Sequence, residues 1–506
     1  MNSAVGKEPN HINQDSKRLS KDTLTYGIAV IIPALIGVIS ISIYTRIFSV
    51  EAYGEYNQIF NTTLLITTLF SQWIQQSIQR YRPLYRSKDK LWEFNENLTN
   101  LLAYMFIIII GFALLTSFLK NSFGRYEEYY WICVLLILTQ FSFLVLGALL
   151  QSDFKVREYK NYNLLTAILK FIVGILLVFY VSRDPISIIY GLVIGQIILI
   201  GFMFKENGLS LRSLRLSPTL QLVEFIKTFV IYGFPMVGWF VGNSILNLAD
   251  RYMLEAMSSI KDVGVYSANY SLVSASLGLL TTPLLNAAHP IIMNKVDKFS
   301  DIEIGKTVTF FTRIYLMISL PLLSFITAFH KEITQLLLGE KFREGSVIIP
   351  ILFLGLIFWN LGMYGHKGYE IKEKTKIMLT FVLVSAGINI IFNIFLIPLY
   401  GYKGAAIATL ISMGTYPLLI KICSFKYIAW KINIWSTIRI TVSCVLSFFI
   451  VFVIKNLLTG YVVIQLIVGV AITVIVYMGI LIILKEINYQ ELKEKILQKR
   501  KSSSSK

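Results

Sequence analysis

The residues that could do chemistry in this chain are charged side chains set inside long apolar segments. Lys170 lies in the middle of one such segment, and Asp250 and Arg251 stand side by side near the end of another. If these segments cross a membrane, a charge at the centre of a helix costs about 2.5–3.5 kcal/mol on insertion scales, so it usually pairs or faces a watery cavity. Lys170 therefore predicts a polar cavity, with a structural ion pair as the alternative.

Asp250 and Arg251 allow two interpretations. They could form a neutral pair that closes the end of an apolar helix at the membrane surface. They could instead act as a gate or an ion-coupling pair, because a carboxylate beside a polar cleft can exchange a proton or a cation when a ligand binds. Arg46 ends an earlier apolar segment on the same side and joins these gate candidates.

Amide side chains recur at helical spacing in two of the segments. Gln72 lies on a polar helical face with Gln76 close by, and Asn243 and Asn247 share a face with Asp250. Polar residues often line the seams between packed helices, which is the simpler interpretation. Long amides need more partners than a tight seam offers, so we favour a water-filled cleft with four candidate substrate-binding residues: Gln72, Gln76, Asn243 and Asn247.

The sequence shows no residue pattern typical of an enzyme or a metalloprotein. Its three cysteines, Cys133, Cys423 and Cys444, all fall inside apolar runs, so neither a disulfide framework nor a metal site is expected. No glycine-rich phosphate loop is followed by Lys and Ser or Thr, the signature of a nucleotide-driven motor. We expect no cofactor, no metal and no catalytic residue, and hence no enzyme.

The elements that position these residues are membrane helices. The chain is 55% hydrophobic and 15% charged, whereas soluble domains are about 25% charged. Apolar runs of about 20 residues, enough to cross a hydrocarbon core of roughly 30 Å as a helix, recur along its whole length. The sequence predicts an all-α polytopic membrane protein with about fourteen transmembrane helices, at roughly 24–48, 57–79, 97–119, 129–151, 161–181, 186–204, 225–249, 264–290, 307–329, 346–366, 377–398, 403–425, 434–454 and 461–484.

The net charge of +18 indicates an orientation rather than a nucleic acid partner. No cluster of Lys and Arg interleaved with aromatic residues forms a nucleic-acid groove. If the N-terminus is cytoplasmic, the inner segments hold about three times as many Lys and Arg residues as the outer loops. Both termini are therefore predicted to be cytoplasmic. Arg313 lies near the inner end of its helix, from which its side chain can reach the inner surface.

An internal repeat divides the predicted helices into two lobes. Aligning Gly54 with Gly264 also aligns Tyr56 with Tyr266, and the second predicted helix then overlays the eighth without gaps. Six helices per copy is an even number, so the two copies form a parallel repeat. We predict a cytoplasmic segment 1–23, an N-lobe 24–206, a linker 207–224, a C-lobe 225–425, two appended helices within 434–484 and a basic cytoplasmic tail 485–506.

Several short motifs resemble bacterial polysaccharide flippases of the multidrug/oligosaccharidyl-lipid/polysaccharide exporter superfamily. Ala249-Asp-Arg-Tyr-Met-Leu followed by Val263-Gly-Val-Tyr-Ser-Ala resembles the region of their seventh and eighth helices. Leu396-Ile-Pro-Leu-Tyr-Gly-Tyr-Lys-Gly-Ala-Ala, preceded by Asn389, resembles the region of helices eleven and twelve. Arg46-Ile-Phe-Ser-Val-Glu-Ala-Tyr-Gly resembles the loop after the first helix, so the resemblance spans roughly residues 24–425.

The resemblance implies a flippase that moves undecaprenyl-pyrophosphate-linked oligosaccharide repeat units, for O-antigen lipopolysaccharide or capsule, from the inner to the outer leaflet of the bacterial cytoplasmic membrane. Two lobes would open alternately to each side. Lys170 and Arg313 are the candidates to meet the anionic pyrophosphate, and Asp250 is the candidate for coupling to H+ or Na+. Membrane lipid and a polysaccharide polymerase are possible partners.

Three alternatives remain open. Two appended helices also occur in lipid II flippases of this superfamily, so a peptidoglycan precursor is a possible substrate. A multidrug or cation antiporter of the same superfamily is the nearest rival. A membrane glycosyltransferase or polymerase would need a sizeable outer loop for its site, and the predicted outer loops are short.

Overall fold

The computed structural model describes residues 32–215, 219–293, 296, 299–424, 427–457 and 460–486. Within these ranges the chain forms helices and no strand, as predicted. The predicted cytoplasmic segment 1–23 and nearly all of the predicted tail 485–506 lie outside the described residues. Helices suit a bilayer interior, because each satisfies its own backbone hydrogen bonds.

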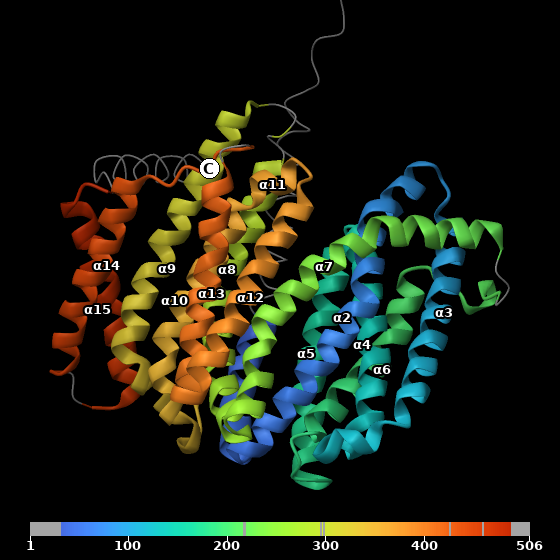
Figure 1. Cartoon of the computed structure of the whole chain (residues 1–506), viewed down its shortest axis with the longest axis horizontal. Helices are drawn as coiled ribbons and strands as arrows, with labels where there is room; N and C mark the ends of the chain where they lie inside the picture. The colour runs from blue at the N-terminus through green and yellow to red at the C-terminus, as the bar shows by residue number, and fades with distance from the viewer. Residues whose placement is uncertain are drawn as a thin grey trace, which may run out of the picture.

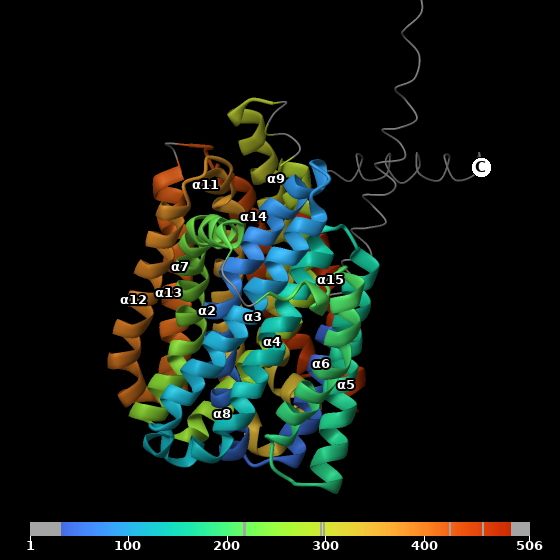
Figure 2. The same cartoon turned by 90° about the vertical axis from the view of Figure 1, so that its right-hand side faces the viewer.

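The first group of helices, which we call the N-lobe, begins with a helix over Ile32–Ile47. In this group α4 packs against α2 and α6, and α6 packs against α5 (Figure 2). α3 has few contacts with its neighbours and lies at one side of the molecule (Figure 1). The remaining helices of the N-lobe are α2 (Val50–Ser87), α3 (Leu91–Ser117), η1 (Lys120–Tyr129), α4 (Tyr130–Ser152), α5 (Val156–Tyr180) and α6 (Ser187–Glu206).

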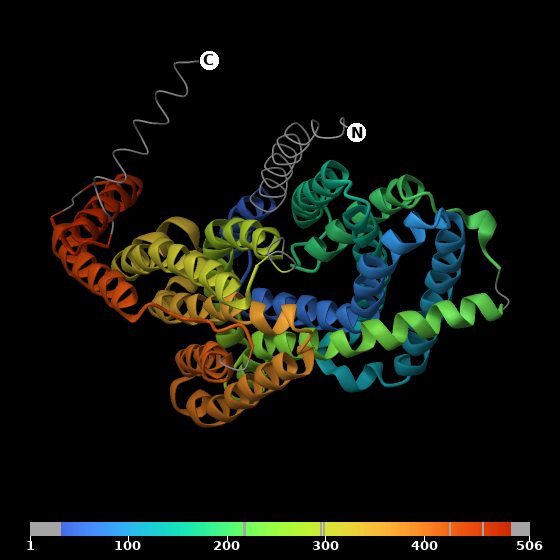
Figure 3. The same cartoon turned by 90° about the horizontal axis from the view of Figure 1, so that it is seen from above.

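The second group, the C-lobe, follows the short helix η2 (Leu211–Ser213), and two further helices pack against its α9. Seen from above, α14 (Ile434–Lys455) and α15 (Val462–Ile483) lie at the edge of the molecule far from the N-lobe (Figure 3). The C-lobe consists of α7 (Leu220–Met257), α8 (Ile260–Met293), α9 (Asp301–Leu337), η3 (Glu340–Ile348), α10 (Ile349–Gly365), α11 (Lys367–Ile371), α12 (Thr375–Tyr400) and α13 (Tyr402–Cys423).

A helix occupies each of the fourteen ranges predicted from the sequence. By length and composition, ten of the described helices are apolar enough to cross a membrane, or eleven if the bent α7 is one span. The helix at Ile32–Ile47 is shorter, and α2 and α8 are long but not among the ten. The number of spans and the exact lobe boundaries therefore stay predictions.

α7 connects the two lobes. It consists of Leu220–Phe234 and Val237–Met257, which meet at an angle of 45° at Pro235, a residue that cannot donate the usual helical hydrogen bond. The first half lies on the N-lobe, where the hydroxyl of Ser77 donates to the carbonyl of Phe229 at 2.9 Å. The second half packs against α12 in the C-lobe. Any change in the angle between the lobes must therefore act on α7.

We call the end of the bundle that holds Ser49, Gly124 and Gly339 the outer end, following the predicted orientation; it is at the bottom of Figure 1. The two glycines on which the predicted repeat was aligned meet here. A Cβ on Gly264 would lie 2.0 Å from the carbonyl oxygen of Val50, and one on Gly54 would lie 2.6 Å from that of Ile260. Val50 and Ile260 are themselves 210 residues apart, so the contact is reciprocal, as an approximate two-fold axis requires.

Further contacts between the lobes close the outer end. A terminal nitrogen of Arg46 donates to the carbonyl of Leu336 in α9 at 2.6 Å. The backbone N–H of Gly339 donates to the hydroxyl of Thr45 at 3.0 Å. Arg46, a predicted gate residue, thus lies in the contact that separates the interior from the outer side.

We predict that Gly264→Ala opens the outer end, because the added methyl group has no room against Val50. Overpacking costs about 1–3 kcal/mol, or roughly 5- to 150-fold in the ratio of closed to open molecules. The rings of Tyr53 and Phe342 lie 5.5 Å apart across the lobes, so cysteines at these positions should cross-link with a short reagent in the closed molecule.

The measurement is the cross-linked fraction in a chain that lacks its three native cysteines. Gly387→Ala is the matched control, since a Cβ there meets no atom within 4 Å. Equal cross-linking in the Gly264→Ala and Gly387→Ala proteins would show that the glycine contact does not hold the outer end closed.

Candidate functional site

The outer half of α7 carries the polar residues predicted for the site, and their side chains separate into two groups. Asp250 points into the C-lobe, where its side chain is completely buried. Arg251 turns the other way and donates to the hydroxyl of Ser267 at 3.2 Å. No ion pair joins Asp250 and Arg251 among the described residues, so the neutral-pair interpretation does not describe this structure.

Four side chains from three helices donate hydrogen bonds to the carboxylate of Asp250. One oxygen accepts from the amides of Asn389 at 2.9 Å and Asn393 at 2.7 Å, both on α12. The other accepts from the hydroxyls of Tyr266 on α8 and Thr409 on α13, both at 2.5 Å. Charge-assisted hydrogen bonds are the strong ones, and here they offset part of the cost of burying an anion.

The Asp250 cluster is rich in oxygen atoms. It combines a carboxylate with two hydroxyls and two side-chain amides, and the amide oxygen of Asn393 has no hydrogen-bond partner among the described residues. Amide nitrogen and oxygen exchange places when the group turns over. After such a turn the amide oxygens would join the carboxylate in facing a hard cation. The cluster differs from a typical metal site, because no three His, Cys, Asp or Glu residues are grouped so that they could hold a metal ion in the part of the chain that the structure describes.

Arg251 and Asn247 both contact Tyr270, whose ring stacks with that of Tyr266 in the Asp250 cluster. The guanidinium of Arg251 lies 4.8 Å from the ring centre of Tyr270, within range of a cation–π contact. The hydroxyl of Tyr270 donates to the amide oxygen of Asn247 at 2.7 Å. Asn247 in turn donates to the amide oxygen of Asn243 at 3.1 Å. Arg251 therefore follows Asp250 directly in the sequence and contacts Tyr270, which lines a polar cavity.

This polar cavity lies between α7, α8 and α10 and has a volume of about 290 Å³. It contains the two asparagines predicted from α7, so their amides do face a cavity rather than a packed seam. Amides and hydroxyls dominate its lining, together with one indole ring: Asn243, Asn247, Tyr270, Ser274, Thr281, Thr282, Trp359 and Asn360.

Lys170 lies at mid-helix in α5 of the N-lobe, with its ammonium group 4.4 Å from the ring centre of Phe60 on α2. No acidic side chain pairs with it among the described residues. A lysine at this depth without a carboxylate leaves its charge to the aromatic face and to whatever ligand enters.

The glutamines of α2 lie apart from this cavity. Gln72 and Gln76 are half-buried, and Gln75 donates to the amide oxygen of Gln72 at 3.5 Å along the same helix. Asn57, which is buried, donates to the carbonyl of Tyr53 one turn earlier. The polar face of α2 thus satisfies part of its hydrogen bonding within the helix, as Asn247 does on α7 by donating to Asn243.

Arg313 does not join the central polar residues. Its Nε donates to the carboxylate of Glu486 at 2.7 Å, and this carboxylate also contacts Arg439 and Ser436 on α14. The ion pair fixes the end of α15 to α9 and neutralises the charge of Arg313. The sequence identified Arg313 without its partner, because Glu486 was assigned to the tail.

The sequence also missed several residues of the site. Asn389 and Asn393 are spaced by one helical turn in an apolar segment, a signal that could have indicated a shared polar face. Trp359 and Thr409 carry no such signal, because an isolated indole or hydroxyl in a membrane helix is common.

Solved structures of two kinds share this fold. A lipid II flippase MurJ in an inward closed conformation aligns with a TM-score of 0.75 and 17% sequence identity, over 93% of this chain and 99% of that one. An inward-facing multidrug resistance transporter of the MATE family aligns with a TM-score of 0.58 and 14% identity, over 82% of this chain and 98% of that one.

Two archaeal proteins are similar in sequence. The probable low-salt glycan biosynthesis flippase Agl15 of Haloferax volcanii is 20% identical over 69% of this chain and 71% of its own length. The uncharacterized membrane protein MJ1068 of Methanocaldococcus jannaschii is 22% identical over 72% of each chain.

The model of one protein family, described as polysaccharide biosynthesis protein, matches residues 19–295. This range contains the N-lobe, α7 and α8, and hence the repeated glycines and most of the polar residues described above. The relatives and the fold agree with a flippase of the multidrug/oligosaccharidyl-lipid/polysaccharide exporter superfamily. The chain belongs to the polysaccharide biosynthesis protein family.

Proposed function

We propose that this protein is a flippase that moves undecaprenyl-pyrophosphate-linked oligosaccharide units from the inner to the outer leaflet of a bacterial cytoplasmic membrane. The polar cavity between α7, α8 and α10 carries the proposal. It lies near the buried carboxylate of Asp250 and on the inner side of the closed outer end. A large polar headgroup cannot cross hydrocarbon unaided. Two lobes that open alternately would shield it without any covalent chemistry.

The cavity between α7, α8 and α10 is suited to sugar hydroxyl groups. Side-chain amides contain both donors and acceptors, which matches the mixed hydrogen bonding of a hydroxyl. Asn243 and Asn360 line the cavity, and Asn247 would exchange its bonds to Asn243 and Tyr270 for bonds to the sugar. Trp359 adds a flat apolar surface for the C–H face of a sugar ring. Neutral groups of this kind fit a glycan better than they fit a cationic drug.

Lys170 is the proposed contact for the pyrophosphate. Its ammonium group has no acidic partner among the described side chains, and it lies beside Phe60 on α2. Arg46 and Arg251 are proposed to act in gating, since both contribute to contacts near the outer end. Gln72 and Gln76 stay candidates for contact with the substrate in a more open arrangement of the lobes. Arg313, paired with Glu486, is not included.

The Asp250 cluster is the proposed site of the coupling ion. Sodium prefers oxygen ligands, which the carboxylate, the hydroxyl of Thr409 and the turned amides of Asn389 and Asn393 would supply. A proton on Asp250 would serve the same end by removing an acceptor. Either event would change the hydrogen bonds that join α7 to α12 and α13. Because α7 connects the lobes, the angle between the N-lobe and the C-lobe would change as well.

Lipid II is the second candidate substrate. The fold shared with a lipid II flippase extends over nearly the whole chain, including the two helices α14 and α15 beyond the C-lobe. A multidrug exporter has less support, because the structures of that family align over a smaller part of the chain. Cytoplasmic termini and a polymerase partner belong to the same proposal.

We predict that Lys170→Ala lowers glycan export while the protein still inserts, and that Lys170→Arg keeps more of the activity. A charged hydrogen bond to a phosphate contributes about 1.5–3 kcal/mol, or roughly 10- to 150-fold in binding. The measurement is surface glycan in cells that lack their own flippase. Lys205→Ala, an exposed lysine at the end of α6, is the control. Wild-type export by the Lys170→Ala protein would remove this residue from the mechanism.

We predict that sodium stabilises the purified protein through Asp250. A ligand at 100 times its Kd adds about 2.7 kcal/mol to the free energy of unfolding. Replacing potassium by sodium at constant ionic strength should therefore raise the unfolding midpoint, and Asp250→Asn should abolish this rise. Asp301→Asn, at the exposed start of α9, should leave it intact. A sodium effect that persists in Asp250→Asn would place the ion elsewhere, and an Asp250-dependent effect of pH alone would favour the proton.

A further inference from the structure

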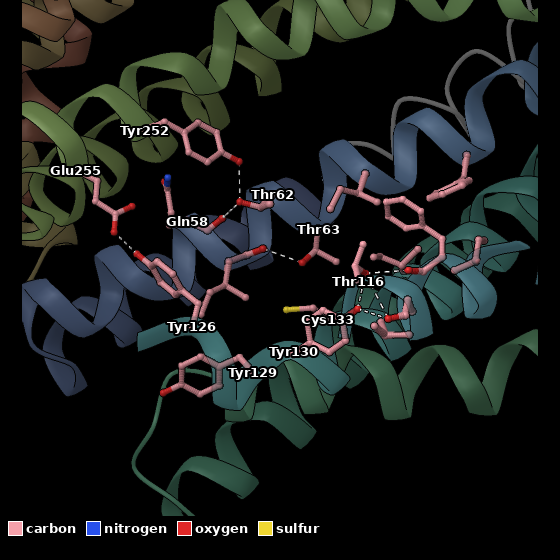
Figure 4. A pocket seen from close by; sticks show the side chains of 18 residues that line it. Gln58, Thr62, Thr63, Thr116, Tyr126, Tyr129, Tyr130, Cys133, Tyr252 and Glu255 are labelled. Carbon is pink, nitrogen blue, oxygen red and sulfur yellow. Dashed lines mark hydrogen bonds between the residues drawn. The ribbon is translucent and has the colours of Figure 1, made fainter. Parts of the chain in front are cut away.

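A cavity whose role is unassigned lies in the N-lobe, away from the polar cavity of the C-lobe. It has a volume of about 500 Å³, within the usual range of ligand pockets. α2, α3 and α4 form its walls, and the end of α7 contributes Tyr252 and Glu255 at one side (Figure 4). No residue proposed for substrate or ion binding lines it.

The cavity is polar at its outer end and apolar further in. Near the outer end, Tyr126 of η1 donates to the carboxylate of Glu255 at 2.5 Å, and the hydroxyls of Thr62 and Tyr252 lie 2.6 Å apart. Deeper along α2, the lining residue Phe70 faces apolar side chains of α3 and α4, including Ile109, Phe112 and Ile137.

The length of the cavity matches one leaflet of a bilayer. Gln58 and Phe70 both line it, and twelve residues of helix extend about 18 Å at 1.5 Å per residue. Half of a hydrocarbon core of roughly 30 Å is about 15 Å. The polar end of the cavity faces the loops at the outer end of the bundle. In the predicted orientation, this end lies at the depth of the outer-leaflet headgroups and the apolar end lies at the depth of the acyl chains.

The buried side chain of Gln58 indicates that a ligand binds in this cavity. This side chain rises from α2 toward Tyr252 and Glu255 of α7 (Figure 4), and the residue is 4% exposed. Both its amide nitrogen and its amide oxygen lack a hydrogen-bond partner within the described ranges. A buried amide without partners pays its full desolvation cost, so such groups are rare in folded proteins unless a ligand or a water satisfies them.

An apolar cavity of this kind excludes water but admits hydrocarbon. α3 packs loosely against its neighbours, and Phe112, which lines the cavity, is also half exposed on the outer surface of the helix. Around a membrane protein, that surface meets lipid chains. The cavity is therefore accessible to lipid from the side of α3.

We propose that this cavity binds one acyl chain of an outer-leaflet phospholipid. The chain lies along α2 between α3 and α4, with its ester carbonyl accepting a hydrogen bond from the amide N–H of Gln58. The amide oxygen of Gln58 accepts from a donor of the headgroup. An ionised polyprenyl phosphate offers acceptor oxygens but no donor, so it would leave the amide oxygen of Gln58 unpaired.

The test uses the full chain in nanodiscs with a phosphatidylethanolamine that carries a photoreactive diazirine at mid-chain. Cross-linked residues are mapped by mass spectrometry. We expect labelling at 109–113 of α3 and 134–137 of α4 above that of Ile475, a residue on α15 that is 71% exposed. Ala113→Trp, which fills the cavity, should remove this excess and leave the labelling of Ile475 unchanged.

Gln58→Leu tests the polar contact without changing the volume greatly. Loss of the amide should lower the excess labelling roughly five- to tenfold, as expected for one hydrogen bond to a buried group. Gln79→Leu, an exposed glutamine of the same helix, is the matched control and should have no effect. Its folding and that of the other variants is checked by size-exclusion chromatography.

Two results would overturn the proposal. One is labelling at 109–113 that never exceeds that of Ile475, or that is the same in the wild-type protein and in both cavity variants. The other is labelling by a diazirine-bearing polyprenyl phosphate at equal concentration with none by the phospholipid. That outcome would assign the cavity to an isoprenoid chain instead.

Discussion

A carboxylate buried in a membrane protein needs a partner for its charge, and the C-lobe is built around that requirement. Asp250 receives four hydrogen bonds from α8, α12 and α13, which fix the position of α7 relative to these three helices. Because α7 also lies on the N-lobe with its first half, the environment of one side chain affects how the two lobes meet. A change in protonation or the arrival of a cation there would alter several interhelical contacts together.

For the lobes to separate, the contacts between them at the outer end must break. Gly54 and Gly264, which the predicted repeat aligns, meet at this end, where the backbones approach too closely for any side chain. Arg46 and Thr45 add hydrogen bonds to the opposite lobe. The predicted duplication would account for a glycine on each side of this reciprocal contact. This close but small contact can form and break as a unit, as alternating access requires.

Composition and apolar length were sufficient to predict the helical fold, because lipid leaves the backbone few other options. The asparagines of α7 were also predicted to face a cavity, since their spacing places them on one face. Long-range partners were beyond the sequence. Asn393 and Thr409 meet Asp250 only after the lobe folds, and Glu486 reaches Arg313 from beyond the last predicted helix. A single chain gives the period of a helix, but it does not give the neighbour that each face meets.

The proposed function requires that the protein alone moves a lipid-linked glycan between leaflets. The deciding measurement is the transfer of undecaprenyl-pyrophosphate oligosaccharide between leaflets of proteoliposomes, followed by the fraction that an added glycosidase can reach. The account predicts that this fraction rises in vesicles with the protein and rises faster under an imposed sodium or proton gradient. A fraction equal to that of protein-free vesicles, for a protein shown to be folded, would contradict it.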